Sequence, residues 1–156
     1  MKIKLVLVFT LMILFSGCGA GKQQANTILD KLDVDFDPPA STLTAFRVAL
    51  DIDPDVQILV NSSVGASTAL DRLNSGLLLM DDNMIAICAY IIEKQGYRPA
   101  ILTLETYLLS NPGGRHHVWA PPVSVTALLK LKGIPDASGG YEEYDDATIK
   151  KAIWGL

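Results

Sequence analysis

The side chains best suited to chemistry or recognition gather in one segment, residues 111–122, where Asn-Pro and Gly-Gly exclude regular structure. The segment holds both histidines of the chain, His116 and His117, together with Arg115 and Trp119. Neighbouring side chains in extended backbone point to opposite sides, which disfavours one metal ion shared by the two histidines. Because arginine and aromatic side chains dominate interface anchors, we treat these four residues as a candidate contact for a protein partner. The alternative is that Trp119 packs on neighbouring helices while the other three side chains are solvated.

Aspartates alternate along two other stretches, residues 33–37 and residues 51–55. Alternating aspartates begin a calcium-binding EF-hand loop, which also needs a glycine at its sixth position and a bidentate acid at its twelfth. The first stretch has proline and threonine at those positions, and the second has valine and serine. We therefore interpret the aspartates as helix caps and solvated turns and predict no metal site. A metal- or calcium-responsive binding module is kept as an alternative function.

Nucleophilic catalysis has little support in the sequence. Residues 65–69 come nearest to a G-x-S-x-G elbow but lack its second glycine. No glycine-rich loop precedes Lys-Ser or Lys-Thr, and no HxxH, HExxH or CxxC spacing is present. Cys88 lies in the most apolar helix, where a thiol is usually inert. We predict a non-catalytic protein without a cofactor, and the alternative is a hydrolase of envelope polymers that uses a carboxylate or histidine with a perturbed pKa.

The first eighteen residues have the zones of an exported chain. Lys2 and Lys4 precede an apolar run, residues 5–15, whose only polar member is Thr10; a serine, a glycine and Cys18 follow. A basic start, a short apolar stretch and small residues before a cleavage site are typical of a secretory signal peptide. The run is shorter than the ~20 apolar residues that a transmembrane helix needs.

The sequence Phe15-Ser16-Gly17-Cys18 resembles the lipobox of bacterial lipoproteins, in which leucine usually stands where Phe15 does. The resemblance implies cleavage before Cys18, which then carries a diacylglycerol and usually an N-acyl chain. Stable anchoring in a membrane needs more than one acyl chain, and this modification provides them. An aspartate after the cysteine commonly means retention at the inner membrane of Gram-negative bacteria, so Gly19 favours the periplasmic side of the outer membrane.

Length and charge set the expected organisation. We expect a signal peptide over residues 1–17, a short polar lipidated tether over residues 18–26, and one helical domain over residues 27–156. Removal of the signal peptide leaves 11 basic and 17 acidic residues, a formal net charge of −6. An acidic chain disfavours a nucleic-acid partner, and at an anionic membrane it is held by its anchor rather than by its charge.

Two consecutive helices in residues 82–110 form the expected centre of the domain. The first is apolar on nearly every side, so other elements must enclose it. The residues left for a narrow water-facing stripe are Asn83, Tyr90, Glu93 and Lys94. Gly96 is a natural helix stop, and Pro99 suits the first turn of the second helix. Other helix starts are expected at Ser41 or Thr42, at Asp53, and at Asp81 or Asp82; residues 56–60 suit a strand as well as a helix.

Residues 90–100 and residues 127–137 match in their apolar, glycine and alanine positions, at an offset of thirty-seven residues. Self-similarity at such a period is typical of stacked helical pairs. The pattern resembles a HEAT-type helical repeat over about residues 82–137. The fold class we expect is all-α, either a short HEAT-like α-solenoid or an irregular helical bundle.

The anchor, the repeat-like helices and the lack of a catalytic motif together favour one function. We expect a lipid-anchored, non-catalytic adaptor or assembly factor that holds a protein partner at the cell envelope.

Overall fold

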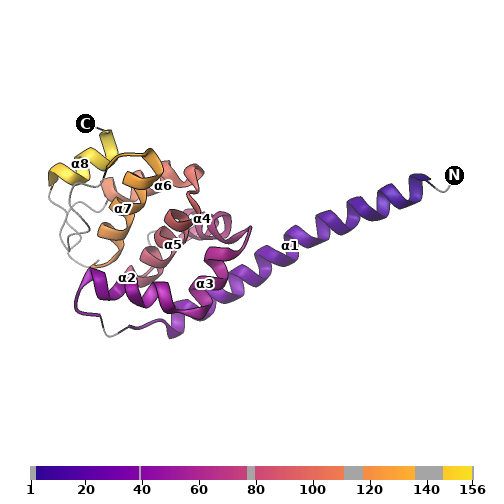
Figure 1. Ribbon diagram of the computed structural model, residues 1–156, viewed down its shortest axis with the longest axis horizontal. Helices are drawn as coiled ribbons and strands as arrows, with labels where there is room; N and C mark the ends of the chain where they lie inside the picture. Colours follow the sequence, from indigo (N-terminus) through magenta and orange to yellow (C-terminus); the bar gives the residue numbers. More distant parts are fainter. Residues whose placement is uncertain (1–2, 39, 77–79, 111–117, 136–145, 156) are drawn as a thin grey trace.

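The all-α prediction is confirmed. The computed structural model describes residues 3–38, 40–76, 80–110, 118–135 and 146–155, with side chains from residue 19 onward except that of Asp146, and it forms helices and no strand in these ranges. The elements are α1 (Ile3–Asp35), α2 (Leu43–Ile52), α3 (Pro54–Asn61), α4 (Gly65–Gly76), α5 (Asp82–Gln95), the 3-10 helix η1 (Arg98–Ala100), α6 (Ile101–Ser110), α7 (Ala120–Lys132) and α8 (Asp146–Trp154). Figure 1 shows a bundle of short helices from which the N-terminal part of α1 projects.

The C-terminal half of α1 packs on α3 and α4. Its buried side chains are Ala25, Leu29 and Leu32. Ion pairs fix it to both neighbouring helices: Lys31 Nζ lies 2.6 Å from Asp55 Oδ2 of α3, and Arg72 Nη1 of α4 lies 2.7 Å from Asp30 Oδ1. Residues 18–26, expected as a tether, therefore continue a helix that is already attached to the body at Ala25. In the part of the chain that the structure describes, no helix has the length and apolar character needed to cross a bilayer.

Helices α2 and α3 begin where the sequence predicts. The Thr42 side chain accepts a hydrogen bond from the N–H of Ala45, and Asp53 accepts from the N–H groups of Asp55 and Val56. Pro54 occupies the first turn of α3, which tolerates the missing N–H. The ambiguous residues 56–60 are helical.

A turn of three residues joins α3 to α4, and the Gln95 side chain at the end of α5 holds it. Gln95 Nε2 donates to the carbonyl oxygens of Leu59, Val60 and Ser62, at 3.1, 2.8 and 2.6 Å. A Cβ atom at Gly65 would stand 2.0 Å from the Leu59 carbonyl oxygen. The two helices approach so closely that the position excludes any side chain.

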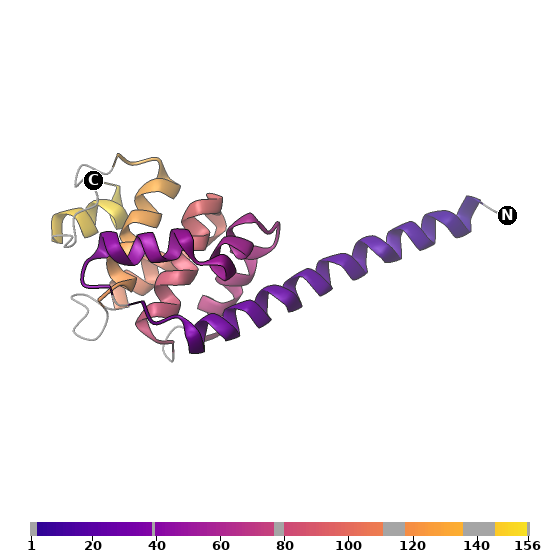
Figure 2. The same ribbon diagram turned by 60° about the horizontal axis from the view of Figure 1, so that its bottom comes forward.

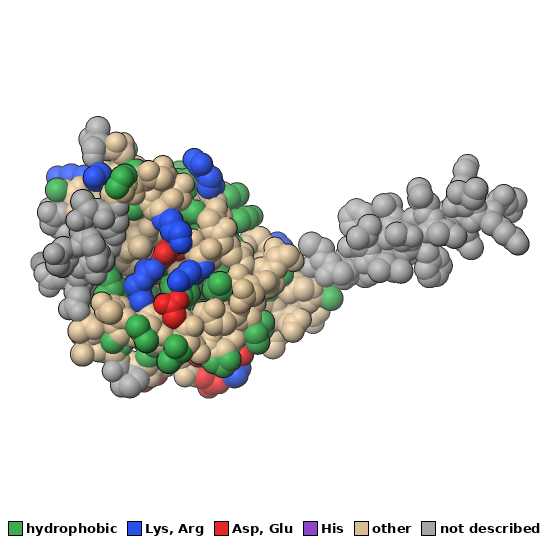
Figure 3. Space-filling model, in the orientation of Figure 1, with side chains coloured by type: hydrophobic (Ala, Val, Ile, Leu, Met, Phe, Trp, Pro, Cys, Tyr) green, Lys and Arg blue, Asp and Glu red, His purple; other side chains and the backbone are tan. Residues whose placement is uncertain are grey.

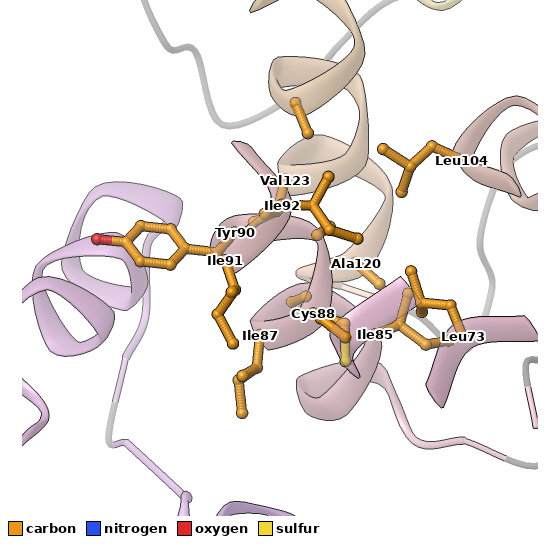
Figure 4. Close-up of a cluster of buried hydrophobic side chains, with 14 of the residues drawn as sticks. Leu73, Ile85, Ile87, Cys88, Tyr90, Ile91, Ile92, Leu104, Ala120 and Val123 are labelled. Carbon is orange, nitrogen blue, oxygen red and sulfur yellow. The ribbon is translucent and has the colours of Figure 1, made fainter. Parts of the chain in front are cut away.

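Helix α5 is the centre of the core, as expected. Asp81 caps it by accepting from the N–H of Met84 at 2.7 Å, and Gly96 ends it with φ 62°. Figure 4 shows the aliphatic side chains of α5 among those of α4, α6 and α7, and it shows the Tyr90 ring pointing toward α2.

The prediction of a water-facing stripe on α5 is wrong for two of its four residues, Tyr90 and Glu93. Tyr90 is fully buried and Glu93 nearly so. The reason is that α2 covers this side of α5: Tyr90 donates a hydrogen bond to Asp51 of α2, and Arg47 of α2 pairs with Glu93.

Helices α5 and α7 lie side by side and run parallel, because their matching ends are joined. Both oxygens of the Asp82 carboxylate accept N–H bonds at the start of α7, including one from Trp119 at 2.7 Å. Near the other end, Lys130 Nζ lies 3.6 Å from Glu93 Oε1. Asp82 and Trp119 are thirty-seven residues apart, as are Glu93 and Lys130, the same offset as in the sequence pattern.

Helix α7 ends as α5 does. Gly133 has φ 69°, and the N–H of Ile134 reaches back to the Leu129 carbonyl oxygen, just as the N–H of Tyr97 reaches Ile92. Helices α6 and α8 pack against α7. Lys132 Nζ of α7 donates to two carbonyl oxygens in the last turn of α8.

Candidate functional site

Charged side chains from three helices, α2, α5 and α7, are brought together in one cluster. Figure 3 shows lysine, arginine and acidic side chains gathered in a hollow on the face over α2, α5 and α7. We call these residues the charged hollow: Arg47 and Asp51 of α2; Tyr90, Glu93 and Lys94 of α5; and Lys130 of α7. Asp51 lies four residues after Arg47 on α2, and Glu93 and Lys94 lie three and four residues after Tyr90 on α5, so each set shares one helical face.

Glu93 forms the deepest ion pair of the hollow. Its side chain is 5% exposed, and Arg47 Nη2 donates to both of its oxygens, at 3.0 and 2.9 Å. Arg47 Nη1 is buried without a hydrogen-bond partner. Lys130, which is half exposed, adds a second positive charge 3.6 Å from Glu93. A buried carboxylate is costly without such partners. The Arg47 pair therefore holds α2 against α5, and the Lys130 contact holds α7 against α5.

Asp51, Tyr90 and Lys94 form the outer part of the hollow. Asp51 accepts hydrogen bonds from the Tyr90 hydroxyl and from Lys94 Nζ, the latter at 2.9 Å. These two bonds, from Tyr90 first and then from Lys94, lower the pKa of Asp51. Burial, assisted by the bond to Asp51, raises the pKa of Tyr90 to about 12, while the bond to Asp51 raises the pKa of Lys94. Lys94 also lies 4.9 Å from the centre of the Tyr90 ring.

This arrangement favours recognition over proton transfer. At physiological pH Asp51 stays ionised, Lys94 stays protonated and Tyr90 stays uncharged, because each shift moves the pKa of the group further from pH 7. The hollow has three cations and two carboxylates, so it carries a local positive excess on an acidic protein. Such a surface suits an acidic group of a partner.

Apolar side chains line the outer face of α2 beside the hollow. Val48 is 51% exposed and Ile52 is 74% exposed. They follow Arg47 and Asp51 directly in the sequence, so the apolar stripe and the charged stripe adjoin on the same helix.

Three of the four residues that the sequence predicts as a partner contact cannot be compared with the charged hollow. Arg115, His116 and His117 lie outside the described residues. Trp119 is partly buried and stacks on Phe46 of α2, with ring centres 4.9 Å apart and an interplanar angle of 10°. Trp119 therefore packs on α2. The side chain of Cys18 is not described, although its backbone belongs to α1.

The alternating aspartates of the second stretch have separate structural roles. Asp51 pairs with Lys94, Asp53 caps α3, and Asp55 pairs with Lys31. Among the described residues, no three His, Cys, Asp or Glu side chains are placed to hold a metal ion.

Sequence reasoning missed Arg47, Asp51 and Lys130 as members of a site. The sequence does hold a signal for two of the three. Arg47 and Asp51 are opposite charges four residues apart, and Tyr90 and Lys94 on the polar stripe of α5 are also four residues apart. What the sequence lacks is any sign that the two stripes face each other. No protein-family model, curated protein or solved structure matches the chain, so its function has to be argued from its own residues.

Proposed function

We propose that the protein is a lipid-anchored, non-catalytic adaptor or assembly factor of the cell envelope, held in the membrane through acyl chains on Cys18. The sequence of the first eighteen residues supports the anchor, and Gly19 favours the outer membrane in a Gram-negative cell. The observation that carries the adaptor role is on α2, where the exposed Val48 and Ile52 directly follow Arg47 and Asp51, the two α2 members of the charged hollow.

The partner surface follows from that observation. Exposed apolar side chains next to paired cations match a partner that offers an apolar strip flanked by carboxylates. Trp119 stacks on Phe46 of the same helix, and we include the predicted contact residues Arg115, His116 and His117, which precede it in the sequence, in the proposed contact.

The alternatives have less support. A metal-responsive module would need converging ligands, and the aspartates of residues 51–55 are engaged in separate interactions. A hydrolase would need a carboxylate whose pKa is raised, whereas the pKa of Asp51 is lowered.

Mass spectrometry of the mature N-terminus tests the anchor. We expect the mass of a diacylglyceryl and N-acyl group on Cys18, and we expect Cys18→Ser to leave the chain uncleaved and unmodified. An unmodified cysteine in the wild-type protein would contradict the proposal.

Cross-linking in intact cells followed by purification of the complex tests the adaptor role. Val48→Asp with Ile52→Asp should abolish the cross-linked species. The matched control is Leu102→Asp with Leu109→Asp on α6, whose side chains are 72% and 51% exposed. Equal cross-linking by both double variants, or no specific partner with the wild type, would contradict the adaptor role.

A further inference from the structure

The end of the body that carries the α3–α4 turn lies very close to the expected site of lipidation. A Cβ atom at Gly21 would stand 3.5 Å from Cγ2 of Val64 in this turn, which is an ordinary contact distance. One residue later, Lys22 Nζ lies 2.7 Å from Asp71 Oδ2 of α4. The chain is thus attached to the body from Gly21 onward, three residues after Cys18.

Three residues restrict how the body can sit on a membrane. They span about 4.5 Å as a helix, and at most about 11 Å when fully extended. A domain of this size is roughly 35 Å across. The link is shorter than the radius of the body in either conformation, so the end that holds Val64 must lie near the lipid to which Cys18 is attached.

The charge distribution supports the same orientation. Residues 56–70, which form most of α3, the turn and the start of α4, contain no charged side chain. The mature chain has a formal net charge of −6, so most of its surface is repelled by an anionic leaflet. Repulsion is weakest where the protein presents neutral side chains such as Asn61 and Ser63.

We propose that the α3–α4 turn is the membrane-facing surface of the protein, lying against the lipid head groups; this inference rests on the proposed lipidation of Cys18. Helix α8 then lies at the far end of the body, away from the bilayer. Figures 1 and 2 show it on the side opposite to the projecting N-terminal part of α1.

Fluorescence quenching in vesicles tests the orientation. Ser63→Cys in the turn and Lys150→Cys in α8 are each labelled with an environment-sensitive fluorophore; both positions are exposed, and the native Cys88 is buried. The lipidated, labelled proteins are reconstituted in vesicles of phosphatidylethanolamine and phosphatidylglycerol that contain a lipid with a nitroxide head group. We expect severalfold stronger quenching at position 63 than at position 150. Equal quenching, or stronger quenching at position 150, would overturn the inference.

A linker variant tests the cause of the orientation. Insertion of a flexible Gly-Ser segment of ~20 residues after Ala20 allows a separation of about 25 Å, and it should make the two positions nearly equal. A difference that survives the insertion would show that the short link does not set the orientation. Mass spectrometry of the same samples separates the two proposals. An unmodified Cys18 contradicts the anchor, whereas a lipidated protein with equal quenching contradicts only the orientation.

Discussion

The side-chain oxygen of Gln95 accepts a hydrogen bond from the backbone N–H of Ala66, at 2.9 Å. The nitrogen of the same amide donates to three carbonyl oxygens at the end of α3. A single side chain at the end of α5 therefore caps the end of one helix and the start of the next. The polarity of the amide matters, because both its donor and its acceptor are used.

Gln95→Glu should be more harmful than its small change in shape suggests. The variant keeps an acceptor for Ala66 but places a second carboxylate oxygen against the carbonyl groups of α3. We expect a loss of roughly 2–3 kcal/mol in the free energy of unfolding, measured by urea denaturation. Asn61→Asp is the control, since Asn61 makes one exposed hydrogen bond to Gln57. Equal effects of the two variants would argue against the capping role.

Gly65→Ala should also destabilise the protein, through backbone overlap rather than lost hydrogen bonds. The added methyl group would meet the Leu59 carbonyl oxygen at 2.0 Å, so α3 and α4 must separate. We expect a loss of roughly 2–3 kcal/mol in the same assay. At Gly76 an added Cβ would meet, among the described residues, only the Met80 side chain, at 3.7 Å, and Gly76→Ala should change stability little. A mild Gly65→Ala variant would show that the contact between α3 and α4 relaxes easily.

Arg47→Met tests the buried ion pair. The substitution leaves Glu93 buried with the more distant Lys130 as its one ion-pair partner among the described residues. We expect a loss of about 2–4 kcal/mol, because an uncompensated buried charge is costly. The double variant Arg47→Met with Glu93→Met should be more stable than Arg47→Met alone. The control is Asp30→Asn, which breaks an exposed pair with Arg72 and should cost less than about 1 kcal/mol. Additive effects in the double variant would contradict the coupling.

Asp51 should make stability depend on pH in the acid range. Its pKa is lowered in the folded protein, so its contribution is present above the unfolded pKa of about 3.9 and is lost as pH falls through the folded pKa. The side chain is half exposed, so we expect Asp51→Asn to cost less than about 1 kcal/mol near neutral pH. The difference between the wild type and Asp51→Asn should shrink as the pH falls from about 5 to about 2. A difference that stays constant over this range would rule out the titration of Asp51 as its source.

Cys88 should be inert toward thiol reagents in the folded protein. Burial raises the pKa of its thiol to about 12, and its Sγ lies 3.9 Å from the sulfur of Met84. Labelling must follow unfolding, so we expect a rate at least ~10³-fold below that of the exposed Ser63→Cys thiol. The measurement is a time course of labelling in buffer and in urea. Rapid labelling in buffer would show that α5 is not enclosed by its neighbours.

The sequence predicts the helix boundaries well because their causes are local. The caps at Thr42, Asp53 and Asp81 and the stop at Gly96 each depend on residues within a few positions. The enclosure of α5 is also predictable, because a helix that is apolar almost all round has to be covered.

The charged hollow could not be predicted in the same way. Tyr90 and Glu93 look solvent-facing because each is a polar residue on the one polar stripe of α5. Their burial depends on Arg47 and Asp51, some forty residues earlier in the chain. Asp82 likewise accepts hydrogen bonds at the start of α7 from residues that lie almost forty positions later in the chain. Long-range pairing of polar side chains leaves no periodic trace in the sequence, so the structure is needed to find it.

The bond between Asp82 and the start of α7 also affects the electrostatics of the core. Parallel neighbouring helices place their peptide dipoles side by side with the same polarity, so their positive ends repel each other. The Asp82 carboxylate lies between the two positive ends, at the first turn of α5 and against the first N–H groups of α7. At the opposite, negative ends the chain places Lys94, Lys130 and Lys132. The mutual repulsion of two aligned helices is thereby offset at both poles, where α5 and α7 form the most extensive contact among the described helices.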